Sequence, residues 1–153
     1  MTDEQLYAKD WLNRMYRVSM HIESLRSKQQ EVLSSMSGIG QYDSEHIPAQ
    51  TGENSSETKL INYSYYAEII ERELKKLCRE DIRTSEVIEK LGDTPEDDTM
   101  KSILNYRYLE RLPWEMVAQK VNYGSTRIFE LHAIALTKIY PYIPRGEVDY
   151  ETL

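Results

Sequence analysis

Five side chains near the carboxyl end of the chain have the chemistry needed to contact the edges of nucleic-acid bases. They follow Gly124 closely and combine hydroxyl, guanidinium, aromatic and carboxylate groups: Ser125, Thr126, Arg127, Phe129 and Glu130. Hydroxyl and guanidinium groups donate hydrogen bonds to phosphates and bases, and a carboxylate accepts one from cytosine. With Ala133, these residues are spaced to share the outer face of one helix. The spacing predicts a face suited to the major groove of duplex DNA.

Basic side chains around this segment are candidates for binding phosphates, namely Arg107, Arg111, Lys120 and Lys138. The whole chain has a formal net charge of −7, but its charges are unevenly distributed. Residues 101–145 hold 7 basic and 3 acidic side chains, whereas residues 1–100 hold 12 basic and 20 acidic ones. Binding to a phosphate backbone depends on the contacting face and not on the total charge. Only the C-terminal third therefore has the sign that DNA requires.

Two helices joined by a tight turn must position these side chains. We expect the first helix from Trp114 and the second from Gly124 onward, with the hydroxyls of Ser125 and Thr126 available for capping. Asn122 occupies the turn, where a left-handed backbone conformation is needed. Ala118 is small where the second helix passes closest. The apolar positions that lock the pair are Val117, Val121, Tyr123, Ile128 and Leu131.

The N-terminal part of the chain carries apolar residues at alternating spacings of three and four, which is typical of a helical seam. These positions are Ala8, Trp11, Met15, Val18, Ile22, Leu25, Gln29, Val32 and Met36. Thr2 and Gln5 form a capping-box pattern at its start. We expect one long helix that ends near Gly38 and Gly40, followed by a polar connector over about residues 37–55.

A second seam with the same spacing predicts another long helix, which begins after Asn54 with Glu57 in a capping-box position and ends at Gly92. Its positions are Leu60, Tyr63, Ala67, Ile70, Leu74, Leu77, Asp81, Thr84, Ile88 and Leu91. The two helices are expected to form an antiparallel, coiled-coil-like hairpin over residues 1–92. Further apolar residues beside the seams need cover, either from the C-terminal module or from a second copy in a homodimer: Leu12, Tyr16, Leu33, Tyr66, Ile69, Ile82 and Val87.

A third helix is expected from Pro95 to about Glu110, because Thr94 is a good N-cap and acidic residues follow it near the positive end of the helix dipole. The fold class is therefore all-α, a long helical hairpin followed by a C-terminal helix-turn-helix. The expected domains are residues 1–92 for oligomerisation or partner binding and residues 93–145 for DNA binding. Residues 146–153 form an acidic tail.

The segment ILNYRYLERLPWEMVAQKVNYGSTRIFELHAIALTKI resembles region 4 of sigma-70-type factors. The residues that carry the resemblance are Arg107-Tyr108, Ala118, the stretch from Ser125 to Ile128, and Ala135-Leu136-Thr137-Lys138-Ile139. Together with the N-terminal hairpin, it is also similar to phage-encoded regulators of late gene transcription of the ArpU and RinA type. The resemblance implies a sequence-specific DNA-binding regulator of phage or prophage genes, for which RNA polymerase is a further candidate partner.

The sequence offers little for other classes of chemistry. It contains no phosphate-cradling glycine loop and no nucleophile with a spaced base, so we expect no catalytic residues and no enzyme. Cys78 is the single cysteine and is expected to be buried on the second seam, while His132 is expected to face solvent. The three histidines lack ligand-like spacing, so neither a metal nor another cofactor is expected. No stretch resembles a signal peptide or a membrane span, which favours a cytoplasmic protein without membrane contact.

Two alternatives to a regulator remain. In one, the helix-turn-helix is only a packing unit, and the acidic hairpin makes the protein an adaptor for RNA polymerase or another helical partner. In the other, the protein is a phage DNA-packaging or assembly factor, since such proteins also join DNA-binding modules to helical oligomerisation segments.

Overall fold

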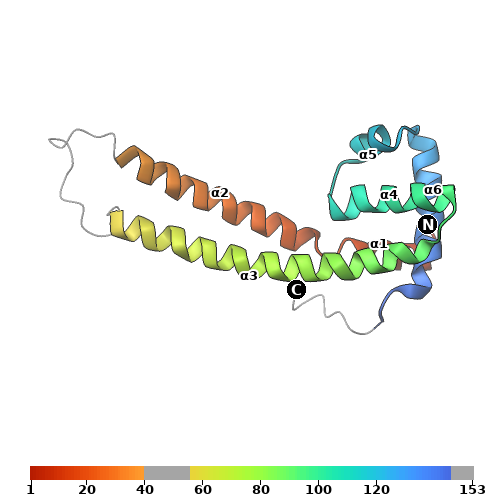
Figure 1. Cartoon of the computed structure of the whole chain (residues 1–153), viewed down its shortest axis with the longest axis horizontal. Coiled ribbons are helices and arrows are strands. Elements are labelled where there is room, and N and C mark those ends of the chain that lie inside the picture. Colours follow the sequence, from red (N-terminus) through yellow and green to blue (C-terminus); the bar gives the residue numbers. More distant parts are fainter. Residues whose placement is uncertain (40–55, 146–153) are drawn as a thin grey trace. The chain divides into compact units, whose positions relative to one another are not determined.

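The structure of this protein is a computed structural model that describes residues 1–39 and 56–145 (Figure 1). Within those ranges every regular element is helical and no strand is present, as predicted for an all-α chain. The chain forms two compact units, one built from Met1–Arg17 and the chain from Cys78 onward, the other from Val18–Leu77. Most of the predicted connector and the acidic tail at residues 146–153 lie outside the described residues.

The first predicted helix is interrupted. Helix α1 (Asp3–Leu12) begins with the expected capping box, in which the side chains of Thr2 and Gln5 each accept from the other's backbone N–H. Helix α2 (Tyr16–Ile39) starts only after a turn. At this turn the buried Arg14 side chain donates to the Trp11 carbonyl oxygen and to Glu80, whose carboxylate is 3.2 Å away. The prediction of one continuous helix was wrong. A heptad pattern reports only the spacing of apolar residues and gives no sign of an ion pair with a distant residue.

Helix α3 (Ser56–Ile88) continues into a 3-10 turn, η2 (Glu89–Leu91), and ends at Gly92 as predicted. Gly92 has φ +125°, a region that favours glycine. The predicted cap at Asn54 lies outside the described residues. In the unit Val18–Leu77, the segments of α2 and α3 lie side by side (Figure 1). The side chains buried there come from the two predicted seams: Val18, Ile22, Leu25 and Ile70.

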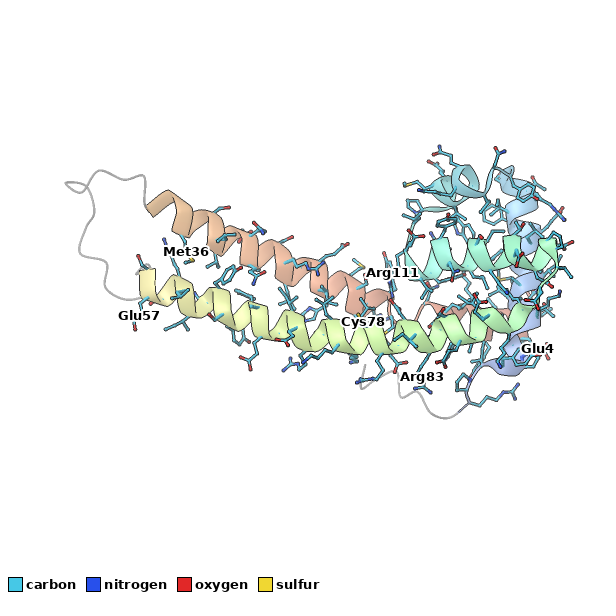
Figure 2. All side chains as sticks on the ribbon, viewed as in Figure 1. Glu4, Met36, Glu57, Cys78, Arg83 and Arg111 are labelled. Carbon is cyan, nitrogen blue, oxygen red and sulfur yellow. The ribbon has the colours of Figure 1, made fainter. Side chains whose placement is uncertain are left out.

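Residues close to the predicted seams have different environments. Cys78 is a free, exposed cysteine on α3 (Figure 2), which contradicts its predicted burial. It follows Leu77 directly, and one residue turns a helix by about 100°, enough to leave the buried face. Leu12 and Val87 are buried, whereas Tyr16 and Ile82 are largely exposed.

The core of the unit that begins at Met1 combines α1 and the end of α3 with the C-terminal helices. Gln5 Nε2 on α1 donates to the Ala133 carbonyl oxygen at 3.1 Å and to Thr137 Oγ1 at 3.0 Å. The N-terminal residues thus belong to the same unit as the C-terminal helices, which differs from the expected boundary at residue 92. Its fully buried members include Ala8, Trp11, Ile88, Met100, Ile103, Leu104, Val117, Ile128, Leu131, Ala135, Leu136 and Ile139.

Helix α4 (Pro95–Leu104) begins with the predicted cap at Thr94, where Asp97 completes a capping box. The buried Asp97 also accepts from Lys138 Nζ at 2.8 Å. This bond and those from Thr94 lower the pKa of Asp97. The helical backbone extends to about Glu110 as expected, but after Leu104 it widens into a π-helical turn, η3 (Asn105–Leu109).

Candidate nucleic-acid interface

A three-residue turn separates the last two long helices. Helix α5 (Trp114–Val121) ends at Asn122, and helix α6 (Ser125–Ile139) begins after Gly124. Asn122 has φ 59° and ψ 44°, the left-handed conformation predicted for it. The N–H groups of Asn122 and Tyr123 both donate to the carbonyl oxygen of Ala118, which ends the helix. The chain therefore does not continue as one helix through Asn122.

Buried apolar side chains hold α5 and α6 in place. Val117, Ile128 and Leu131 are at most 1% exposed, and Ala118 and Val121 pack against the same core. These five positions agree with the predicted lock. Tyr123 does not, because it is 45% exposed. It lies in the turn itself, where the left-handed residue before it directs the chain away from the core.

The five predicted base-contacting residues on α6 are all exposed: Ser125, Thr126, Arg127, Phe129 and Glu130. Ala133 is partly buried. Arg127 Nη1 lies 3.3 Å from Glu130 Oε2, and both side chains are about half exposed. An exposed pair of this kind contributes at most about 1 kcal/mol and is screened by salt. The pair can therefore open when a stronger partner for the guanidinium arrives.

The first turn of α6 has unused hydrogen-bond donors. Gly124 is its N-cap, and among the described residues no side chain bonds the backbone there, although the Ser125 and Thr126 hydroxyls were expected to cap. A side chain at Gly124 would meet no described residue within 4 Å other than its neighbours in the chain, so the space beside this residue is open. The N–H groups at a helix start carry partial positive charge and bind anions.

Aromatic side chains connect the start of α5 to α6. The Trp114 ring packs edge-on against Phe129 with ring centroids 5.2 Å apart, and against His132 at 4.7 Å. The Arg107 guanidinium lies over the Trp114 ring at 4.8 Å and donates to the Leu112 carbonyl oxygen. Trp114 therefore packs between the two helices, and it holds Arg107 beside α5.

The other three predicted phosphate-binding residues differ in their surroundings. Lys120 is exposed, with its ammonium 6.0 Å from the centre of the Tyr106 ring. Arg111, which is labelled in Figure 2, binds Asp81 at 2.9 Å, and Lys138 binds Asp97 at 2.8 Å. The charges of Arg111 and Lys138 are thus balanced inside the fold.

His132 was expected to face solvent, but it is only 2% exposed. It lies on the inner face of α6, and its Nε2 is 2.6 Å from the Tyr108 hydroxyl oxygen. Burial, aided by the positive charges of Lys9 and Arg107, lowers the pKa of His132 to about 4. Burial raises the pKa of Tyr108. The Arg107-Tyr108 pair therefore supports the α5–α6 corner from two sides, through Trp114 and through His132.

The described part of the chain has no group of three or more His, Cys, Asp or Glu side chains able to hold a metal ion. None of its helices is long and apolar enough to cross a membrane. No protein-family model matches the chain, and comparisons with curated proteins and with solved structures likewise find no match.

Proposed function

We propose that the protein binds duplex DNA, with α5, the turn at Asn122 and α6 acting as a helix-turn-helix and α6 entering the major groove. The observation that carries this proposal is the two-sided character of α6. Its inner face is fixed in the core by Ile128 and Leu131, while its outer face is exposed from Ser125 to Arg127. A rigidly seated helix with a free polar N-terminal face is what groove recognition requires.

The side chains divide into two proposed roles. Ser125, Thr126, Arg127 and Glu130 would lie nearest the bases, since they occupy the first turns of α6. Phe129 would contact the apolar thymine methyl group beside them.

Phosphates would be bound by Lys120, Arg107 and the uncapped N–H groups at Gly124. Arg111 and Lys138 are left out of the contact set because they already bind carboxylates within the fold. The resemblance to sigma-70 region 4 supports the same orientation, and it makes a regulator of phage or prophage transcription the preferred biological role.

The two long helices would serve oligomerisation or partner binding. In the unit Val18–Leu77, large apolar side chains remain exposed on α3, namely Leu60, Ile61 and Tyr65. Several exposed apolar side chains close together are typical of surfaces that bind another protein. A second copy of the chain and RNA polymerase are the candidates for that surface.

A protein-interaction adaptor is the second candidate function, and a specific observation favours it. Three large apolar side chains are exposed on or beside the proposed DNA-binding face: Met116 at 43%, Tyr123 at 45% and Phe129 at 50%. Such a surface can bind a protein as well as a thymine-rich groove. The two functions differ in whether the protein binds DNA at all.

Selection from random duplex fragments, followed by sequencing and gel-shift measurements, tests the proposal. A sequence-specific regulator enriches a motif, and Arg127→Ala weakens binding to it and reduces the salt dependence. Sequence-independent binding would instead indicate a packaging factor. If no fragment is retained at low salt, the DNA-binding proposal is wrong and the adaptor is favoured.

A further inference from the structure

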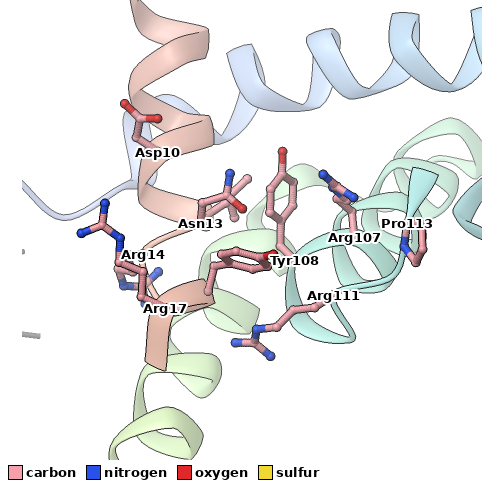
Figure 3. Close-up of a pocket in the computed structure, with 10 residues that line it drawn as sticks. Asp10, Asn13, Arg14, Arg17, Arg107, Tyr108, Arg111 and Pro113 are labelled. Atoms are coloured by element: carbon pink, nitrogen blue, oxygen red, sulfur yellow. The ribbon is translucent and has the colours of Figure 1, made fainter. Parts of the chain in front are cut away.

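A pocket in the unit that contains α1, which shares only Arg107 with the proposed DNA contacts, has the features of an anion site. It has a volume of about 770 Å³ and is lined by the end of α1, the turn that follows it, the first residues of α2, and the segment from η3 to Pro113 (Figure 3). Four arginines line it, with Arg14 and Arg17 on one side and Arg107 and Arg111 on the other. Asp10 is the one carboxylate among its described lining residues.

Two of these arginines are fixed parts of the wall. Arg14 is buried, stacks over the Trp11 ring at 3.9 Å and binds Glu80. Arg111 binds Asp81, which is next to Glu80 on α3. Buried and half-buried ion pairs of this kind hold their guanidinium groups in one orientation, because breaking either pair would leave an uncompensated charge. The wall is therefore rigid as well as basic.

The charges of the other two arginines are not compensated by an ion pair with a described residue. Within residues 1–39 and 56–145, neither Arg17 nor Arg107 has a carboxylate partner within ion-pair distance. Arg17 is exposed, and Arg107 is held by Trp114 and the Leu112 carbonyl oxygen. Glu80 and Asp81 compensate the charges of Arg14 and Arg111. The carboxylate of Asp10 can offset only one of the two positive charges that remain. The pocket thus keeps an excess of positive charge.

The backbone beside the pocket is unusual in two ways. Arg111 has φ 59°, which is uncommon for a residue with a side chain. It follows Glu110, the residue that caps the π-helical turn η3 and whose N–H donates to the Asn105 carbonyl oxygen. Strained residues and π-helical turns both concentrate at functional sites. Here they place the Arg107 and Arg111 side chains on the same pocket.

We propose that this pocket binds a phosphate group, with Arg17 and Arg107 as its charged contacts. Planar guanidinium groups bind two phosphate oxygens at once, and arginine is the residue best suited to that geometry. The pocket volume is in the range of small-molecule sites and exceeds the size of a single phosphate. The phosphate can belong to a small free polyphosphate or to a DNA backbone, and an experiment can distinguish these sources.

Isothermal titration of the full chain with sodium pyrophosphate at constant ionic strength tests the proposal. Saturable binding is expected, and Arg17→Gln and Arg107→Gln should each weaken it by about tenfold, the loss typical of one charged hydrogen bond. Asp10→Asn should strengthen binding, because it removes the opposing charge. Fluorescence of Trp11 and Trp114, which stack on Arg14 and Arg107, gives a second readout at the pocket.

Arg72→Gln is the matched control, since Arg72 is an exposed arginine on α3 outside the pocket. Absence of saturable binding, or equal weakening by Arg72→Gln and Arg17→Gln, would overturn the proposal. Arg17 is exposed, so its variant should keep the thermal stability of the parent chain.

A duplex titration then identifies the source of the phosphate. If Arg17→Gln weakens both ligands, the pocket binds the DNA backbone; if it weakens only pyrophosphate, the ligand is a free polyphosphate. Arg127→Ala should leave pyrophosphate binding unchanged, so the pocket and the α6 face are tested separately.

Discussion

The Tyr108 hydroxyl oxygen lies 2.6 Å from His132 Nε2 inside the core that seats α6. Burial keeps the tyrosine protonated and the histidine neutral at pH 7, so the hydroxyl can donate to the imidazole. The recognition helix proposed here is therefore seated partly on a hydrogen bond that protonation of His132 would break.

This pair makes fold stability depend on pH. The pKa of His132 is about 4 in the folded chain and ordinarily about 6.5, so between these values the unfolded chain binds more protons. The contribution is fully present above pH 6.5 and is lost as the pH falls towards 4. The free energy of unfolding should fall by on the order of 2–3 kcal/mol across this window, as measured by urea denaturation.

His132→Gln is the control for that measurement. It should be less stable at pH 7, because the imidazole packs against Trp114, but it should lack the decline between pH 6.5 and 4. Asp97, whose pKa is lowered, loses its stabilising effect only as the pH falls below its ordinary 3.8. An equal decline in the parent chain and His132→Gln would exclude His132 as the cause.

Removing the charge of Lys120 and removing that of Lys138 should have different effects on stability and on DNA binding. Lys138→Gln removes the partner of the buried Asp97, so it should lower the unfolding temperature and leave the salt dependence of DNA binding unchanged. Lys120→Gln should leave stability unchanged and reduce the slope of log K against log salt by about one. Thermal unfolding and gel shifts at several salt concentrations measure both. A reversed pattern would return Lys138 to the set of phosphate contacts.

Gly124 offers a way to separate folding from DNA binding. Gly124→Asp should cap α6 and favour its positive end, which stabilises the fold by up to about 1 kcal/mol. The same carboxylate would occupy the N–H groups and repel a phosphate, so DNA affinity should fall. Gly124→Ser is the neutral match, with a gain of only a few tenths of a kcal/mol. Undiminished DNA affinity in Gly124→Asp would show that this helix end is not a phosphate contact.

Asn122 tests the turn itself. Its left-handed backbone is tolerated by asparagine and glycine, whereas a β-branched side chain there is strained. Asn122→Val should lower the free energy of unfolding by about 1–2 kcal/mol, and Asn122→Gly should change it little. Denaturation midpoints of the two variants, compared with the parent chain, provide the measurement. Equal effects would mean that the conformation of the turn does not limit stability.

Local signals in the sequence determined several elements correctly. The capping box at Thr2, the N-cap at Thr94, the helix end at Gly92 and the left-handed Asn122 all agree with the structure. In each case a residue satisfies backbone groups within a few positions of itself or adopts a conformation that its own side chain permits. Nothing distant in the chain is needed to establish them.

The tertiary structure decided which polar groups are buried and what they bind. Arg14 interrupts the first helix through a partner 66 residues away, and Lys138 binds an acid 41 residues away. The burial of His132 likewise depends on Tyr108 and on the N-terminal helix packed against α6. Helical periodicity shows which side of a helix is apolar. A buried charge or imidazole, however, is stable only beside a particular partner, and that partner comes close only when the chain folds.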